Sequence, residues 1–292
     1  MSNAPSRNTY TPVADTPAPP PGSDTTEPAP SWRFVLATDL DGTFLGGTQA
    51  MRASLYRWIA QQRQDVGLIF VTGRDPDFIV DLCARRASIE DTVPTPDYVV
   101  ADVGTTLARM DQPPPGEGSR PVLHILHTLE APIAEAWGAR ADLVRRTLAR
   151  APGLKEQETA FRHRVSYHCD PEQHDPTFTA PLEREGLDIL LSHGCFLDVL
   201  PGGVNKGSTL LRLMDHLGIA RSKVLVAGDT LNDLSMFQTG LHGAVVGGAE
   251  SGLLAATCDL PHARQCQTAG AGGIAEAIAA FQLHPEPPET SL

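Results

Sequence analysis

Apolar runs alternate with helical segments along most of this chain, and this alternation constrains the fold more than any other feature. Residues 34–38 (FVLAT), 68–71 (LIFV) and 224–227 (VLVA) are almost continuously apolar, as expected for strands buried on both faces of a parallel sheet. Residues 51–59, between the first two runs, repeat apolar side chains at helical spacing. The pattern predicts a doubly wound α/β fold, with a Rossmann-like, mostly parallel sheet between two layers of helices.

A stretch of different character interrupts this alternation at residues 112–199. It opens with a turn-rich segment (QPPPG, 112–116) and continues with short strand-like runs, the first at 122–126, separated by helical stretches. Short strands mixed with helices are typical of a small α+β domain. We therefore expect residues 112–199 to form a cap domain, inserted between core segments 31–111 and 200–284.

Both ends of the chain differ from the interior. Residues 1–30 are rich in Pro, Ser, Thr and Ala, and such a segment has too little apolar surface to offset the entropy lost on ordering. We expect a disordered N-terminal tail, with docking of a partner as a less favoured role. Residues 285–292 are expected to form a second, shorter loose end.

Composition excludes several classes of partner. The net charge is −12 over 292 residues, which argues against nucleic acid and against an anionic membrane surface. No apolar run is long enough to span a membrane, and the N-terminus lacks the pattern of a secretory signal. The five cysteines form no C-x-x-C pair, so we expect reduced thiols in a cytoplasmic protein.

Asp39 and Asp41 form the strongest chemical signal. They directly follow the first apolar run, and ligands of open α/β sheets bind at the carboxyl ends of the strands. One carboxylate could attack phosphorus as a nucleophile, while the other gives a proton to the leaving oxygen and later activates water. A lone D-x-D could equally be an ordinary turn.

Thr72, Gly73 and Arg74 follow the second apolar run. A hydroxyl and backbone N–H groups at this position could hold phosphate oxygens, although a simple capped turn would have the same sequence. Lys206 follows Asn205 at a predicted helix start, where its charge opposes the helix dipole. Pairing with Asp39 and with a phosphate would explain it, and a solvated surface lysine is the alternative.

Asp229, Asn232 and Asp233 follow the apolar run at 224–227. Such a cluster of oxygen ligands after a strand suits Mg²⁺, although it could also be a capped helix start. All four signals fall at carboxyl ends of predicted strands or at helix starts, so a single cleft could gather them. A metal ion there would neutralise charge between the carboxylates and a phosphoryl group.

These four motifs, in this order, resemble those of the haloacid-dehalogenase superfamily of phosphatases over residues 34–280. The resemblance implies that Asp39 is the nucleophile, Asp41 the general acid/base, and that Thr72 and Lys206 bind the phosphoryl group. It also implies a Mg²⁺ site made by Asp39, the backbone carbonyl of Asp41 and Asp229, with Asn232 and Asp233 in support. An insertion between the second and third motifs is similar to the larger cap of type IIB members.

Within that branch, the chain most resembles sucrose-phosphate phosphatases and relatives that complete the synthesis of glycosylated compatible solutes. The segments that carry this similarity are 103–105, 163–167, 200–207 and 228–237. The resemblance implies a phosphorylated disaccharide or glycosyl-polyol as substrate, and association with a glycosyltransferase as a further expectation. The residues expected at the substrate are Thr43, Gly73, Arg74, Asn205, and in the cap His163 and Arg164, which could instead be surface residues.

The sequence is also compatible with other functions. A phosphosugar mutase of the same fold would need a bisphosphate activator and release no phosphate. A non-catalytic binding or scaffold protein is also conceivable, but Asp39, Asp41, Lys206 and Asp229 are all present, which argues against it. Six of the ten histidines lie between residues 124 and 193, and no recurring ligand spacing supports a zinc site there.

Overall fold

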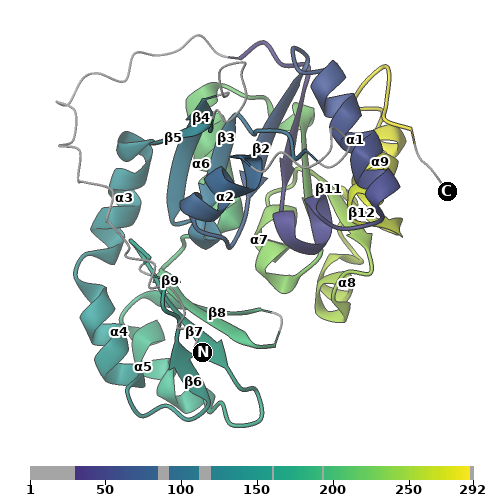
Figure 1. The fold of residues 1–292 in the computed structure, drawn as a ribbon. Helices are drawn as coiled ribbons and strands as arrows, with labels where there is room; N and C mark the ends of the chain where they lie inside the picture. Colours follow the sequence, from purple (N-terminus) through teal and green to yellow (C-terminus); the bar gives the residue numbers. More distant parts are fainter. Residues whose placement is uncertain (1–29, 85–91, 112–119, 160, 193, 290–292) are drawn as a thin grey trace, which may run out of the picture.

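The computed structural model describes residues 30–84, 92–111, 120–159, 161–192 and 194–289. The predicted tail at 1–30 therefore lies almost wholly outside the described residues. Within them the strands form a sheet of eight and a sheet of four. Figure 1 shows the large sheet with its helices in the upper lobe and the small sheet in the lower lobe.

The large sheet is mostly parallel, which confirms the predicted fold class. Its strands, in their order across the sheet, are β12 (Ala263–Ala269), β11 (His242–Gly247), β10 (Val224–Gly228), β1 (Phe34–Thr38), β2 (Val66–Val71), β3 (Tyr98–Ala101), β4 (Thr106–Asp111) and β5 (Val122–Ile125). The six strands from β12 to β3 run parallel, β4 pairs antiparallel with β3, and β5 pairs antiparallel with β4. β1 lies in the interior of the sheet, and its five residues are all buried.

The fifth strand corrects the predicted domain boundary. We expected the run at 122–126 to be the first strand of the insertion at 112–199, but β5 pairs with β4 at the edge of the large sheet, from Ala108 opposite Ile125 to Asp111 opposite Val122. Alternate side chains of an edge strand face the core and solvent, and Leu123 and Ile125 pack against the apolar core. The chain therefore enters the cap only after this strand.

Helices cover both faces of the large sheet. One face is covered by α1 (Gln49–Gln61), α2 (Pro76–Ala84) and α9 (Ala271–Ala280). The other is covered by α6 (Lys206–Leu217), α7 (Leu234–Phe237) and α8 (Ser251–Thr257). Among the described residues, none of the helices has both the length and the apolar character needed to cross a bilayer.

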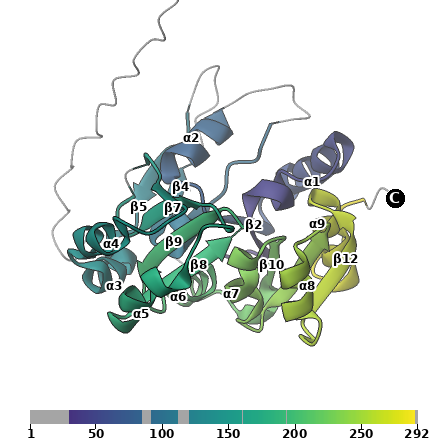
Figure 2. The ribbon, with the colours of Figure 1, turned by 90° about the horizontal axis from the view of Figure 1, so that it is seen from below.

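The cap is an antiparallel sheet covered by helices on one face. Its strands, in spatial order, are β6 (Leu154–Glu156), β7 (Val165–Cys169), β9 (Phe196–Pro201) and β8 (Leu187–Ser192). Its helices are α3 (His127–Trp137), α4 (Arg140–Leu148) and α5 (Ala180–Arg184). On α3, Ile133 packs with the core and Trp137 with the cap, so this helix joins the two lobes. Figure 2 shows the cap sheet beside the core sheet from below.

The first residues of the predicted loose end at 285–292 have contacts with the core, and 290–292 lie outside the described residues. The Trp58 Nε1–H donates to the Glu286 carbonyl at 2.7 Å, and the Trp58 ring lies edge-on to His284 at 5.2 Å. His284 is buried as a result. Residues 284–286 are thus anchored to α1 because an indole N–H at the helix surface finds a backbone acceptor there.

Candidate active site

Asp39 follows β1 directly, and a sharp turn brings Asp41 to the same edge of the sheet. Gly42 makes this turn possible, since its φ is +77° and a Cβ there would lie 2.2 Å from Asp229 Oδ2. The Asp39 side chain is 8% exposed, whereas that of Asp41 is 45% exposed. Arg74 holds Asp41 in a bidentate pair, with Nε and Nη2 at 2.7 and 3.0 Å from its two oxygens.

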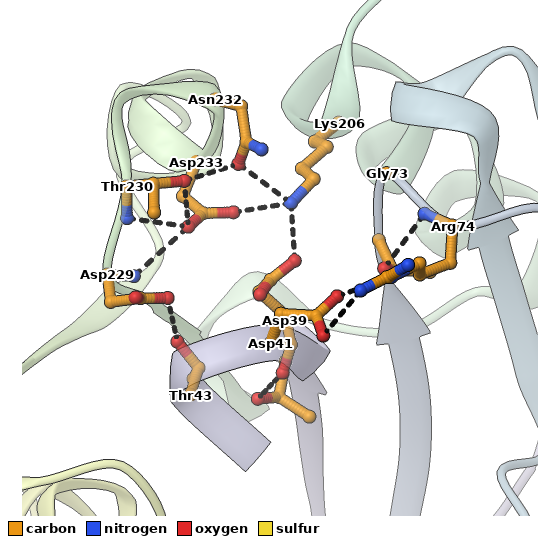
Figure 3. Close-up of polar contacts among 12 residues, drawn as sticks. Asp39, Asp41, Thr43, Gly73, Arg74, Lys206, Asp229, Thr230, Asn232 and Asp233 are labelled. Atoms are coloured by element: carbon orange, nitrogen blue, oxygen red, sulfur yellow. Dashed lines mark hydrogen bonds and ion pairs between the residues drawn. The ribbon is translucent and has the colours of Figure 1, made fainter. Parts of the chain in front are cut away.

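Lys206 lies at the centre of the site although it is fully buried. Its Nζ donates to Asp39 Oδ1 and Asp233 Oδ1, both at 2.6 Å, and to Asn232 Oδ1 at 2.9 Å. Figure 3 shows these three acceptors converging on the ammonium group. The lysine stands in the first turn of α6, so the carboxylates, rather than the helix dipole, account for its position.

Burial and ion pairing act together on these groups. Burial raises the pKa of Asp39 to about 8, against the opposing effect of Lys206, and the nearby Asp233 and Asp229 add to the rise. For Lys206, burial alone would lower the pKa, but Asp233 and Asp39 outweigh it and raise the pKa above its ordinary value. The lysine therefore stays charged, with Asp39 and Asp233 as its carboxyl partners.

The donor set fits a hard divalent cation. Asp39, Asp229 and Asp233 each bring a carboxylate oxygen within 4.8 Å of the other two. Asp233 is largely engaged elsewhere, because Oδ1 accepts from Lys206 and Oδ2 from the backbone N–H groups of Asp229 and Thr230. Asp39 and Asp229 are thus the side chains best placed to bind a metal. Carboxylate oxygens match the preference of Mg²⁺ for hard oxygen ligands.

Thr72, Gly73 and Arg74 form a turn at the end of β2, beside Asp41. The Thr72 hydroxyl accepts from the Arg74 N–H at 3.1 Å. A loop after β3 supports this turn, since Val103 N–H donates to the Thr72 carbonyl and Asp102 N–H to the Arg74 carbonyl, each at 3.0 Å. The second motif therefore lies next to the first, as its position after a neighbouring strand predicts.

A cavity of about 500 Å³ separates the core from the cap. Its lining comprises Asp39, Asp41, Gly73, Arg74, Asp75, Val103, Gln157, Thr159, Phe161, Arg164, Ser192, Cys195, Phe196, Asp198, Thr230 and Asn232. The core supplies the carboxylates of the first motif, and the cap supplies hydroxyl, amide and aromatic side chains. Such a mixture suits a polar ligand with apolar faces.

Two residues predicted to contact substrate have other contacts in the structure, and a third lies outside the cavity lining. Thr43 is fully buried, and its hydroxyl donates to Asp229 Oδ1 at 2.7 Å. The Asn205 side chain caps α6 by accepting from the Ser208 N–H at 2.8 Å. His163 is absent from the cavity lining, whereas Arg164 lines it.

The cap residues of the lining are mostly ones that the sequence did not single out. Phe161, Ser192, Phe196 and Asp198 face the cavity, yet they lie in three separate segments of the cap. Two strand pairings bring these segments together: β7 with β9, which sets Ser166 opposite Asp198, and β8 with β9, which sets Ser192 opposite Phe196. The strand alternation could have suggested which residues share a face, but not that this face lies over the core.

Comparison with known proteins now adds to this geometry. Residues 32–282 match the family described as sucrose-6F-phosphate phosphohydrolase. The chain belongs to this family. Membership confirms the resemblance to haloacid-dehalogenase phosphatases with a type IIB cap. It also confirms the prediction of a sugar phosphatase.

Individual relatives agree with the family. A glucosylglycerol-phosphate synthase of Pseudomonas anguilliseptica is 39% identical over 249 residues, which is 85% of this chain and 31% of that protein. Sucrose-phosphatase 1 of Nicotiana tabacum is 30% identical over 272 residues, or 87% of this chain and 60% of that protein. The chain thus spans about a third and about three fifths of these two relatives.

A solved structure shares both the core and the cap. The sucrose-phosphatase from Synechocystis sp. PCC6803, determined in complex with sucrose and phosphate, aligns with a TM-score of 0.72 at 27% identity. The alignment covers 86% of this chain and 98% of that one. This chain therefore shares its two-lobed arrangement with a solved sucrose-phosphatase.

Proposed function

We propose that this protein is a Mg²⁺-dependent phosphatase that hydrolyses a phosphorylated sugar conjugate through an aspartyl-phosphate on Asp39. One observation carries the proposal: Asp39 lies at the end of an interior strand, fixed by buried Lys206 at 2.6 Å, and lines a cavity that the cap covers. Asp41 lines the same cavity. The proposed nucleophile and a second carboxyl group thus face one cavity, as a two-step transfer requires.

The proposed reaction has two steps. In the first, an Asp39 oxygen bonds to phosphorus, the ester P–O bond breaks, and Asp41 gives a proton to the departing sugar oxygen. In the second, water attacks phosphorus while Asp41 takes up its proton, and the acyl-phosphate bond breaks to release phosphate and restore Asp39. The ammonium group of Lys206 would keep the Asp39 side chain oriented in both steps, as the free carboxylate and as the acyl-phosphate.

Asp39 and Asp229 would hold the Mg²⁺, together with the predicted contribution of the Asp41 backbone carbonyl. When bound, the ion would supply positive charge that stabilises the charge developing on the transferred phosphoryl group. Asp233 and Asn232 would support this site indirectly, since both accept from Lys206. Thr43 would orient Asp229 through its hydroxyl.

We propose a disaccharide phosphate or a glycosyl-polyol phosphate as substrate, such as sucrose 6-phosphate, mannosylfructose phosphate or glucosylglycerol phosphate. Aromatic rings and hydroxyl groups in the cap lining, among them Phe161, Phe196, Thr159 and Ser192, suit the alternating apolar and polar faces of sugars. The names of the relatives support the same class, and the glucosylglycerol conjugate has the support of the more similar one.

An association with a glycosyltransferase is proposed on the same basis. The synthase relative matches this chain over 31% of its own length, so it contains a segment like this one beside much additional sequence. An enzyme that forms the phosphorylated conjugate would supply the substrate of a phosphatase directly. Co-purification of the two activities would support the association. Two activities that separate during purification would contradict it.

The proposed function is tested by phosphate release from a panel of sugar-phosphate esters, with Mg²⁺ and with EDTA, for the parent protein and Asp39→Asn. Release from a glycosyl phosphate that needs the metal and is lost in the variant supports the proposal. If Asp39→Asn kept a tenth or more of the parent rate, the role of Asp39 as nucleophile would be refuted. No release from any ester, but phosphate exchange after addition of a sugar bisphosphate, would favour the mutase.

A further inference from the structure

Arg164 is a cap residue whose side chain reaches into the core. It directly precedes β7, and its side chain is 4% exposed. Nη1 donates to Asp198 Oδ1 of the cap at 2.9 Å, and Nη2 donates to the Gly73 carbonyl of the core at 2.8 Å. Nη2 also lies 3.6 Å from Asp102 Oδ1 in the core. The guanidinium group therefore joins the two lobes at the cavity.

The packing around Arg164 leaves its terminal nitrogens little freedom. Its guanidinium carbon lies 3.7 Å from the centre of the Phe161 ring, which covers one face of the group. Asp198 is fixed in turn, because its Oδ1 also accepts a hydrogen bond from the Ser166 hydroxyl. A planar guanidinium can bond in two directions at once, which the single ammonium of lysine cannot do in the same geometry.

The contact with Gly73 completes the support of the predicted phosphate-binding turn. Three successive carbonyls of this turn each accept one hydrogen bond. The core holds the outer two, through the backbone N–H groups of Val103 and Asp102. The middle carbonyl, that of Gly73, accepts from Arg164 of the cap. The turn therefore has its full set of contacts only when the cap is in place.

This contact also reaches the phosphate-binding hydroxyl. The Gly73 carbonyl and the Arg74 N–H belong to one planar peptide group, so fixing the first orients the second. The Arg74 N–H donates to the Thr72 hydroxyl oxygen at 3.1 Å. A continuous path of hydrogen bonds thus runs from the cap guanidinium, through one peptide plane, to the side chain predicted to bind the phosphoryl group.

We infer that Arg164 is a positioning residue, which sets the geometry of the turn at Thr72–Arg74 from the cap and so makes phosphate binding depend on the seated cap. The inference rests on the proposed function, which places the phosphoryl group at this turn. It differs from the expectation that Arg164 binds the sugar: both terminal nitrogens already bond to protein oxygens, and only its Nε has no hydrogen-bond partner among the described residues. The sugar would instead contact other parts of the cap lining.

The test compares Arg164→Lys with Arg145→Lys. Arg145 is also a cap arginine in an ion pair, with Glu156 at 2.9 Å, but its side chain is half exposed and lies outside the cavity lining. For each variant we would measure the dissociation constant of inorganic phosphate by calorimetry in Mg²⁺. We would also measure kcat and KM for a glycosyl phosphate and for p-nitrophenyl phosphate, which carries no sugar.

We expect Arg164→Lys to weaken phosphate binding by roughly tenfold or more, the effect of losing a hydrogen bond to a charged group. The value of kcat/KM should fall by a similar factor for both esters, because both present the same phosphoryl group. Arg145→Lys should change neither quantity. A rise in KM confined to the glycosyl phosphate, with unchanged phosphate binding, would mean that Arg164 contacts the sugar and would overturn the inference.

Two measurements keep the result interpretable. Should Arg164→Lys fail to fold, Asp198→Asn removes the charge that orients the guanidinium and should weaken phosphate binding in the same direction by a smaller factor; unchanged binding would overturn the inference. Phosphate binding is measured without turnover. A parent protein that binds phosphate but hydrolyses no ester would therefore contradict the proposed function alone, with the effect of Arg164→Lys on binding still deciding the inference.

Discussion

Replacing Lys206 by methionine should destabilise the fold more than any exposed substitution. The ammonium is fully buried and bonds to two carboxylates at 2.6 Å, those of Asp39 and Asp233, which are themselves buried. Methionine keeps much of the side-chain volume, so the change isolates the charge. Removing one partner of a buried ion pair costs about 3–5 kcal/mol, because the remaining charge is left uncompensated.

The assay is urea unfolding at pH 7 in EDTA, so that bound metal does not mask the loss. We expect the free energy of unfolding to fall by about 3–5 kcal/mol for Lys206→Met. Adding Asp39→Asn to Lys206→Met should recover part of this loss, since the amide carries no charge. A loss below about 1 kcal/mol, the size expected of an exposed pair, would show that these carboxylates are not held by the lysine and would refute the reasoning.

Three further predictions concern the metal site and the cap. Gly42→Ala should destabilise the protein by about 1–2 kcal/mol, because alanine is strained at the positive φ of this position. It should also weaken Mg²⁺ binding, measured by calorimetry, because the added Cβ would meet Asp229. An unchanged affinity for Mg²⁺ would contradict this packing. Adding Mg²⁺ at a hundred times its dissociation constant should raise the free energy of unfolding by about 2.7 kcal/mol. Asp229→Asn should lose most of this gain, and Asp111→Asn, an exposed control, should keep it. Burial and the nearby charge of Arg162 lower the pKa of His163 from its ordinary 6.5 to about 4. As the pH drops, the unfolded chain therefore binds a proton at this histidine before the folded protein does, and the free energy of unfolding falls between pH 6.5 and pH 4. His163→Gln should lose less stability than the parent between pH 7 and pH 5 in urea unfolding, and an equal loss would count against a half-buried histidine that stays neutral.

The sequence predicts the core of the site well because local patterns determine it. Each buried strand is a short apolar run, and parallel strands place the residues that follow them at one edge of the sheet. Asp39, Lys206, Asp229 and Asp233 therefore come together as their positions predict, within hydrogen-bond distance or a few ångströms of one another. Their roles in catalysis remain predictions for the experiments above.

Elements with weaker patterns were missed. β12 (ARQCQTA) lies at the sheet edge with most side chains exposed or half-buried, so it lacks the apolar run that marks an interior strand. It also precedes Gly270 and α9, where the sequence showed no clear strand. The orientation of the cap was likewise beyond local reasoning. The bond from Arg164 to the Gly73 carbonyl joins residues 91 positions apart, and only the assembled lobes bring them together.

The central claim is that Asp39 becomes phosphorylated during turnover. The most direct measurement is rapid quenching of the reaction with a glycosyl phosphate, followed by borohydride reduction, which converts an aspartyl-phosphate to homoserine, and by peptide mass spectrometry. The account predicts homoserine at position 39 in the parent protein, dependent on substrate and Mg²⁺. Substrate-dependent homoserine at another aspartate, or phosphate release with no modified residue at any quench time, would contradict it.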